Sequence, residues 1–206
     1  MIERVIIAGS GGQGVMLLGK VLAEAAMRQG WQVSWFPAYG PEVRGGTSYC
    51  MVTISDREVG SVHIAQADSL IILNNPSLER FKSKVKNNGL LILNSSLAKS
   101  NAYAKVKILQ FPFTDIAIKL GNIRVANMVA LGSYLAVKKI IKTENILEVF
   151  KFMAPAGNLK ILEVNELALA IGIQTTASRL VALASGIQTT ASRLVALAEG
   201  EKLNHG

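Results

Sequence analysis

A short buried strand that ends in a glycine-rich turn is the feature that most constrains the fold of this chain. Residues 4–8 form a mostly apolar, β-branched run, and residues 9–14 read GSGGQG. Residues 15–29 then carry apolar side chains at helical spacing, and residues 32–36 return to strand character. A strand, a turn, a helix and a second strand make a βαβ unit, so we expect the first pairing of the sheet to be parallel.

The rest of the chain continues this alternation of strands and helices. Further strands are expected at 48–54, 69–73, 90–93 and 105–111, and helices at 78–85, 115–120, 126–141, 144–152 and 161–170. The 206 residues, half of them hydrophobic, suit one α/β domain with a helical addition. We predict an α/β fold with a Rossmann-like, open, mostly parallel sheet flanked by helices, and a helical C-terminal extension.

The C-terminal part contains an unchanged internal repeat. Residues 172–184 read GIQTTASRLVALA, and residues 186–198 repeat that sequence at an offset of 14 residues. Fourteen residues are close to four helical turns, so equivalent side chains of the two copies fall near one stripe. Two copies are fewer than a solenoid needs. We therefore divide the chain into a Rossmann-like domain, 1–170, and a duplicated helical tail, 171–206.

Charge and composition narrow the classes of function. The net charge is +8, which can indicate a nucleic-acid partner. The basic residues are scattered, however, and no basic stripe is interleaved with aromatic residues, so we expect no nucleic-acid binding. A positive charge also agrees with anionic ligands or an acidic protein partner. No apolar run is long enough to span a membrane and the N-terminus lacks the layout of a signal peptide, so we expect a cytoplasmic protein.

The glycine turn suits an anion but lacks the rest of a dinucleotide site. Gly9, Gly11 and Gly14 match G-x-G-x-x-G, and the following helix offers free N–H groups. The second strand ends in SWFPA (34–38), without the acid or arginine that a nicotinamide cofactor needs at its ribose. Three interpretations stay open: close packing of strand and helix, contact with a phosphate shared with another subunit, or a complete dinucleotide site.

A second unusual segment, YGPEVRGGTSYC at 39–50, follows the second strand. This is the end of the sheet at which open α/β folds bind ligands. Arg44 lies beside Gly45 and Gly46, and an exposed arginine next to flexible backbone suits a carboxylate or a phosphate. The alternative is a surface ion pair between Arg44 and Glu42.

Three separate segments carry a family resemblance: GSGGQGV at 9–15, YGPEVRGG at 39–46 and NMVALG at 127–132. Together, and over about residues 2–166, they resemble the gamma subunit, or catalytic domain III, of 2-oxoacid:ferredoxin oxidoreductases. The TSYC at 47–50 most resembles the 2-oxoglutarate branch, although relatives acting on pyruvate, branched oxoacids and indolepyruvate share much of the pattern. The duplicated tail is not part of the family pattern.

The resemblance implies a subunit of a larger enzyme. The assembled complex would oxidatively decarboxylate a 2-oxoacid to acyl-coenzyme A and CO2, with electrons passing to ferredoxin. Thiamine diphosphate with Mg and iron–sulfur clusters would be held by partner subunits, and coenzyme A would be a cosubstrate. This chain has one cysteine, Cys50, and cannot hold a cluster alone. His63, in a strand-like stretch, and His205 lack a spaced partner for a metal or nucleophile site. We therefore expect no catalytic residue in this chain and an inactive isolated subunit.

The resemblance also implies a shared active-site or coenzyme A edge. Its candidate residues are Gly9, Gly11, Gly12, Gln13, Gly14, Tyr39, Arg44, Gly45, Gly46 and Asn127. Asn127 is expected to cap a helix, or else to reach this edge. Cys50 is expected to be a small buried residue and not a redox thiol. Two competing readings are a stand-alone Rossmann-like protein that binds a nucleotide or acyl-coenzyme A for regulation, and a purely structural subunit.

Overall fold

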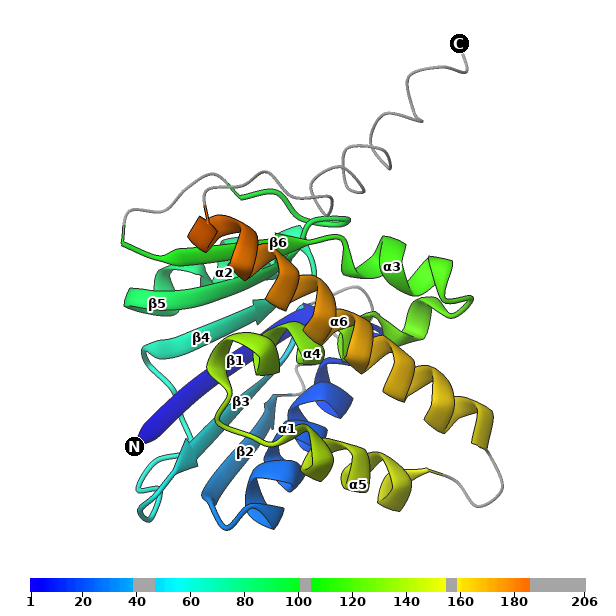
Figure 1. Cartoon of the computed structure of the whole chain (residues 1–206). Helices are drawn as coiled ribbons and strands as arrows, with labels where there is room; N and C mark the ends of the chain where they lie inside the picture. Colours follow the sequence, from blue (N-terminus) through cyan, green and yellow to red (C-terminus); the bar gives the residue numbers. More distant parts are fainter. Residues whose placement is uncertain (39–46, 101–104, 155–158, 186–206) are drawn as a thin grey trace.

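The computed structural model describes residues 1–38, 47–100, 105–154 and 159–185, and its centre is a six-stranded sheet (Figure 1). The strand order is β2-β3-β1-β4-β5-β6. The strands are β1 (Ile2–Ser10), β2 (Gln32–Ala38), β3 (Thr47–Ser55), β4 (Ala67–Ile72), β5 (Val85–Asn94) and β6 (Lys107–Phe111). All of them except β3 run in one direction. The expected α/β fold with a mostly parallel sheet is confirmed.

The expected parallel pairing of the first two strands is wrong. β3 lies between β1 and β2 and is antiparallel to both, with Ile7 opposite Cys50 and Trp35 opposite Val52. β1 pairs in parallel with β4 on its other side. The physical reason is the connection between β2 and β3, whose eight residues, 39–46, are fewer than a parallel crossover needs. β3 therefore returns beside β2 in the opposite direction.

The helices cover the two faces of the sheet unequally. They are α1 (Val15–Arg28), α2 (Asn75–Phe81), α3 (Phe113–Lys119), α4 (Ala126–Lys138), α5 (Thr143–Met153) and α6 (Leu159–Ser185), with 3-10 turns at Lys82–Lys84 and Ile123–Val125. In Figure 1, α1, α4, α5 and α6 lie in front of the sheet and α2 lies behind it. Among these described helices, none has the length and apolarity that crossing a bilayer requires.

Successive side chains of β1 point to opposite faces of the sheet, and the core is divided into two clusters accordingly. Val5 and Ile7 join the large cluster under α1, α4 and α5, whereas Ile6 and Ala8 join the smaller cluster under α2. All four side chains are fully buried. Because successive residues of a strand face opposite sides, a strand buried on both faces has a continuous apolar run. This explains why residues 5–8 read as a strand from sequence alone.

The last helix runs without a break through the predicted boundary of the tail. α6 begins at Leu159 and ends at Ser185, so the division at 170 and 171 falls inside one helix. Its residues Ala168 and Leu169 are buried in the large core cluster. The division into a domain and a tail stays a prediction, and the first copy of the repeat is part of the helix that covers the sheet.

Candidate functional site

The predicted glycine turn lies at the carboxyl edge of the sheet, where the parallel strands end. Ser10, the last residue of β1, is opposite Thr47, and Ala38 is opposite Tyr49. Both ends of the segment 39–46 are therefore at the same edge as the turn. Tyr39, Arg44, Gly45 and Gly46 themselves lie outside the described residues, so their predicted role stays a prediction.

The glycine turn has a backbone that only glycine adopts easily. Gly12 and Gly14 have φ angles of 88° and 73°, in the left-handed region. Gly14 is the N-cap of α1 and supplies no side-chain cap, and the first turn of α1 contains no acidic residue. The free N–H groups and positive end of the α1 dipole therefore face this edge. Gly11 and Gly12 are exposed, so a ligand can approach their backbone.

Gln13 and Ser10 hold the turn against neighbouring strands. The backbone N–H of Ser10 donates to Oε1 of Gln13 at 2.6 Å, and Nε2 of Gln13 donates to the carbonyl of Leu73 at 3.4 Å. Nδ2 of Asn74 donates to the hydroxyl of Ser10. The turn is thus tied to the end of β4 by two side-chain amides, which fixes its shape before any ligand binds.

Asn127 reaches the glycine turn, and the expected helix cap is wrong. The N-cap of α4 is Val125, without a side-chain cap, because a 3-10 turn that Asn122 caps leads directly into the helix. Nδ2 of Asn127 instead donates to the carbonyl of Gly14 at 3.1 Å. A Cβ atom on Gly14 would lie 2.2 Å from that Nδ2. Two of the three sequence segments that resemble the family are therefore in direct contact.

The other side of the Asn127 amide has no partner within the described residues. Asn127 is 2% exposed, and its Oδ1 atom accepts no hydrogen bond. A buried acceptor without a donor costs about 1–3 kcal/mol. Such an atom is common where a ligand, water or partner chain completes the bonding.

Two further asparagines at this edge were missed by the sequence analysis. Asn74 follows β4 and caps α2, accepting from the N–H of Ser77 at 3.0 Å. Asn94 ends β5 and donates to the carbonyl of Leu73 at 3.1 Å and to Oγ1 of Thr114 at 2.9 Å. Their signal was present, since the strands end in IILN (71–74) and LILN (91–94). Polar residues directly after parallel strands gather at one edge of the sheet.

A small hollow opens beside the glycine turn, and we name it the carboxyl-edge hollow. It has a volume of about 140 Å³ and is lined by Gly12, Gln13, Leu73, Asn94, Leu97, Thr114, Ile123, Arg124 and Ala126. Leu97 and Ile123 are 46% and 58% exposed on its rim. Ligand pockets usually enclose about 300–1,000 Å³. The carboxyl-edge hollow is therefore smaller than a usual ligand pocket, and Leu97 and Ile123 give it an exposed apolar rim.

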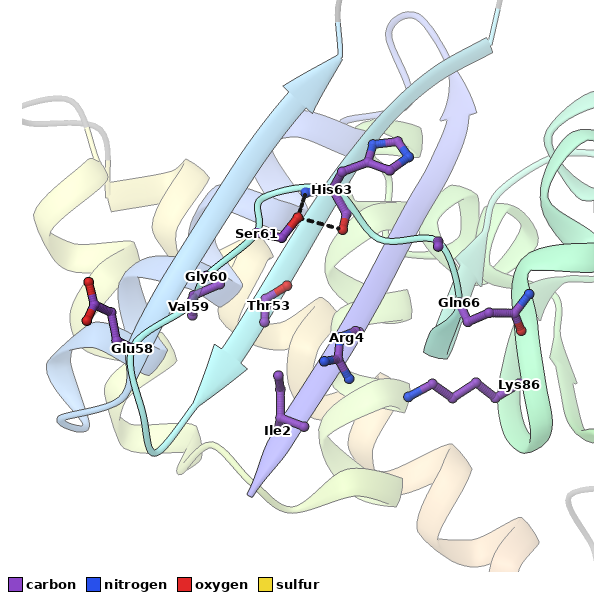
Figure 2. A pocket seen from close by; sticks show the side chains of 11 residues that line it. Ile2, Arg4, Thr53, Glu58, Val59, Gly60, Ser61, His63, Gln66 and Lys86 are labelled. Carbon is purple, nitrogen blue, oxygen red and sulfur yellow. Dashed lines mark hydrogen bonds between the residues drawn. The ribbon is translucent and has the colours of Figure 1, made fainter.

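A larger hollow of about 320 Å³ lies at the opposite edge, and we name it the amino-edge hollow. Figure 2 shows Arg4 from β1 and Lys86 from β5 pointing toward one another across it, whereas the carboxylate of Glu58 points away. Asp68 pairs with Lys86 at 2.5 Å, and its second carboxylate oxygen accepts from the backbone N–H of Arg4 at 2.8 Å. His63 lies in the loop before β4, so its placement in a strand was wrong.

Cys50 is a buried residue of β3, as expected. Its side chain is fully buried, and desolvation raises the pKa of its thiol to about 12. The thiolate is the nucleophile and the metal ligand, so a protonated thiol in the core is inert at neutral pH. The parts of the chain that the structure describes also contain no group of three or more His, Cys, Asp or Glu residues placed to hold a metal.

Several known proteins are similar to this chain in sequence. Residues 4–175 match the family model described as pyruvate ferredoxin/flavodoxin oxidoreductase. Ketoisovalerate oxidoreductase subunit VorA of Methanothermobacter thermautotrophicus is 42% identical over 172 residues, covering 83% of this chain and 36% of VorA. 2-Oxoglutarate synthase subunit KorC of Methanocaldococcus jannaschii is 30% identical over 180 residues, covering 84% of this chain and 94% of KorC.

One solved structure has the same fold as this chain, and nearly all of the solved chain is covered by the match. The gamma subunit of a keto/oxoacid ferredoxin oxidoreductase from Geobacter sulfurreducens superposes with a TM-score of 0.74 at 28% identity, covering 85% of this chain and 99% of that subunit. Against VorA, by contrast, this chain spans about a third of the length of its relative, 36%. With residues 4–175 matched by the family model, this chain belongs to the pyruvate ferredoxin/flavodoxin oxidoreductase family.

Proposed function

We propose that this chain is the gamma subunit of a 2-oxoacid:ferredoxin oxidoreductase and completes an active site that partner subunits share. The observation that carries the proposal is an incomplete site at the carboxyl edge. There, the glycine turn before α1 lines a hollow of only about 140 Å³. Asn127, which donates to Gly14 of that turn, has a buried amide oxygen without a partner among the described residues. The exposed apolar rim formed by Leu97 and Ile123 offers a contact surface for another subunit.

The cofactors of such an enzyme do not fit this chain. An iron–sulfur cluster needs about four thiolates, and the single cysteine is buried with a raised thiol pKa. Magnesium diphosphate needs oxygen ligands grouped around the metal, and the described residues hold no such group. Thiamine diphosphate, magnesium and the clusters therefore belong, in this proposal, to partner subunits, and the isolated chain has no activity.

Coenzyme A is the cosubstrate that the carboxyl edge suits. Its phosphates are anions, and the exposed backbone of Gly11 and Gly12 at the N-terminus of α1 offers N–H donors to an anion. Arg124 lines the hollow beside them. Arg44 stays a candidate for the same role, because Ala38 and Thr47, which flank the segment 39–46, lie at this edge. The role of these residues is to bind and orient the phosphates while partner subunits do the chemistry.

The identity of the 2-oxoacid substrate is a separate part of the proposal. The segment TSYC favours 2-oxoglutarate, the substrate in the name of KorC, a relative that this chain nearly spans. Ketoisovalerate is the second candidate, because VorA carries that name and is 42% identical. Succinyl-coenzyme A or isobutyryl-coenzyme A would be the respective products, each with CO2 and electrons for ferredoxin. The cytoplasmic location also stays a prediction.

An anaerobic affinity purification of the tagged chain from its native cells tests the proposal. We expect a thiamine diphosphate subunit and a cluster-binding subunit to co-purify, and the complex to reduce ferredoxin with one 2-oxoacid of a panel and coenzyme A. Recovery of the chain alone, with tight binding of a nucleotide or acyl-coenzyme A, would instead support the stand-alone regulatory protein.

Kinetics of the purified complex test the site itself. Arg44→Ala should raise the Michaelis constant for coenzyme A while the subunits stay assembled. Arg57→Ala is the matched control, because Arg57 is exposed in the loop after β3, at the opposite edge. Equal kinetics for the two variants would exclude Arg44 from the coenzyme A site, and loss of assembly without a selective effect on coenzyme A would support a structural subunit.

A further inference from the structure

The backbones of α4 and α6 touch at a pair of glycines. A Cβ atom on Gly132 of α4 would lie 2.2 Å from the carbonyl oxygen of Leu169, and one on Gly172 of α6 would lie 2.2 Å from the carbonyl oxygen of Val129. The hydroxyl of Ser133 donates to the carbonyl of Gly172 at 3.5 Å. Neither glycine accepts a side chain without movement of the other helix. The close crossing of α4 and α6 therefore requires a glycine at position 172 of α6.

Four other residues of α6 complete its attachment. Ala168, Leu169 and Thr176 are at most 1% exposed. Arg179 donates from Nη1 to the carbonyl of Gln110 at 3.2 Å, and its guanidinium lies 5.4 Å from the ring centre of Phe111. The attachment thus has a recognisable pattern in the sequence: an apolar pair, a glycine, a threonine and an arginine at fixed spacing along one side of the helix.

The repeat supplies this whole pattern a second time. Each of the five residues recurs 14 positions later, as Ala182, Leu183, Gly186, Thr190 and Arg193. Residues 168–184 and 182–198 are identical except for Ile171, which corresponds to Ser185. Ile171 is only half-buried, so a serine at that position is tolerable. We use the name groove on α4 for the surface around Gly132 that α6 covers. Two segments of this chain therefore carry the residues that contact this groove.

We infer that residues 182–198 can occupy the groove on α4 that residues 168–184 occupy in this structure, so that α6 docks in two registers 14 residues apart. In the second register, Thr176 and Ser178 would take the places of Leu162 and Val164, which pack against the large core cluster. Losing that apolar contact makes the second register the less populated one. The connection after α5 becomes longer, at a cost that grows only slowly with length.

The segment of the same chain is the occupant to which we commit. It is covalently joined to α6, so its effective concentration at the groove exceeds that of a second copy in dilute solution. The second register keeps the groove covered while the residues before Gly172 leave it. The chain can then release the start of α6 to a partner subunit without exposing the core under α4.

Alanine substitutions in the full chain test this inference. Each register places a different glycine of the repeat against α4, whereas both registers need Gly132 of α4. Gly172→Ala blocks the observed register and Gly186→Ala blocks the second. Gly132→Ala lies in the groove and blocks both. We expect Gly186→Ala to leave the urea midpoint unchanged and Gly172→Ala to lower it modestly. The double variant and Gly132→Ala should each lower it at least twofold more than Gly172→Ala.

The controls separate register exchange from other effects. Alanine is a better helix former than glycine, so helix propensity predicts the opposite sign. The helices could shift slightly to accept alanine at position 132. In that case, leucine substitutions of Gly132, Gly172 and Gly186 repeat the comparison of urea midpoints with a larger side chain. A Gly172 variant as unstable as the double variant would overturn the inference, and so would wild-type stability of Gly132→Leu. A Gly172 variant that becomes a dimer in light scattering would show exchange between chains and would also overturn it.

Discussion

The two edges of the sheet carry hollows that differ in size and lining. The amino-edge hollow is the larger, at about 320 Å³, and one of its lining cations, Lys86, pairs with Asp68. The carboxyl-edge hollow is smaller, at about 140 Å³, and its lining combines the glycine turn, the side-chain amides of Gln13 and Asn94, apolar residues and one cation, Arg124. Asn127, which donates to Gly14 of the glycine turn, has a buried amide oxygen without a hydrogen-bond partner among the described residues. The difference teaches that the larger hollow need not be the one beside a buried polar atom that lacks a partner.

Substitution of Gly14 should produce the largest effect at either edge. Gly14→Ala places a Cβ atom 2.2 Å from Nδ2 of Asn127 at a φ angle of 73°. We expect a loss of about 2–4 kcal/mol in the free energy of unfolding, measured in urea. Gly12→Ala is the matched control, since Gly12 has a φ angle of 88° but open space around it, and should cost about 1 kcal/mol. Equal losses of unfolding free energy for the two variants would mean that the side chain of Asn127 moves aside at little cost.

Asn94 should give the next largest effect. Asn94→Ala removes three hydrogen bonds from a side chain that is 1% exposed, two donated by Nδ2 and one accepted by Oδ1, and it leaves the carbonyl of Leu73 with a weaker partner. We expect a loss of about 2 kcal/mol in the free energy of unfolding. Gln66→Ala, at an exposed residue of the amino-edge hollow, should change it by less than about 0.5 kcal/mol. Similar losses at both positions would remove the distinction between the two edges.

The fold could be predicted from sequence further than the site, for a physical reason. Each buried strand is a local apolar run, and the glycine turn is also local, so both are visible in the order of residues. The contact between Asn127 and Gly14 joins positions 113 residues apart, and spacing alone cannot distinguish it from a helix cap. The insertion of β3 beside β1 is equally non-local, although the eight residues between β2 and β3 already indicated an antiparallel return.

Asn127 should affect function more than stability if the proposed coenzyme A edge is correct. Asn127→Ala removes one hydrogen bond, to Gly14, and also removes the unpaired oxygen, so we expect a stability loss of about 1 kcal/mol. A lost hydrogen bond to bound coenzyme A would raise its Michaelis constant in the complex about fivefold. Arg4→Gln in the amino-edge hollow should leave that constant unchanged. An effect of Arg4 equal to that of Asn127 would move the proposed ligand to the other edge.

Lys86 should give the smallest effect, because its ion pair with Asp68 is only partly buried, with side chains 35% and 22% exposed. Lys86→Met keeps the apolar stem and removes the charge, so we expect a loss below about 1 kcal/mol in urea unfolding. The loss should shrink further between about 0.1 M and about 1 M salt, since partly exposed charges are screened. Asp68 keeps its hydrogen bond from the N–H of Arg4 in the variant. A loss above about 3 kcal/mol that salt does not change would instead identify a desolvated pair, and the amino edge would then be as structurally demanding as the carboxyl edge.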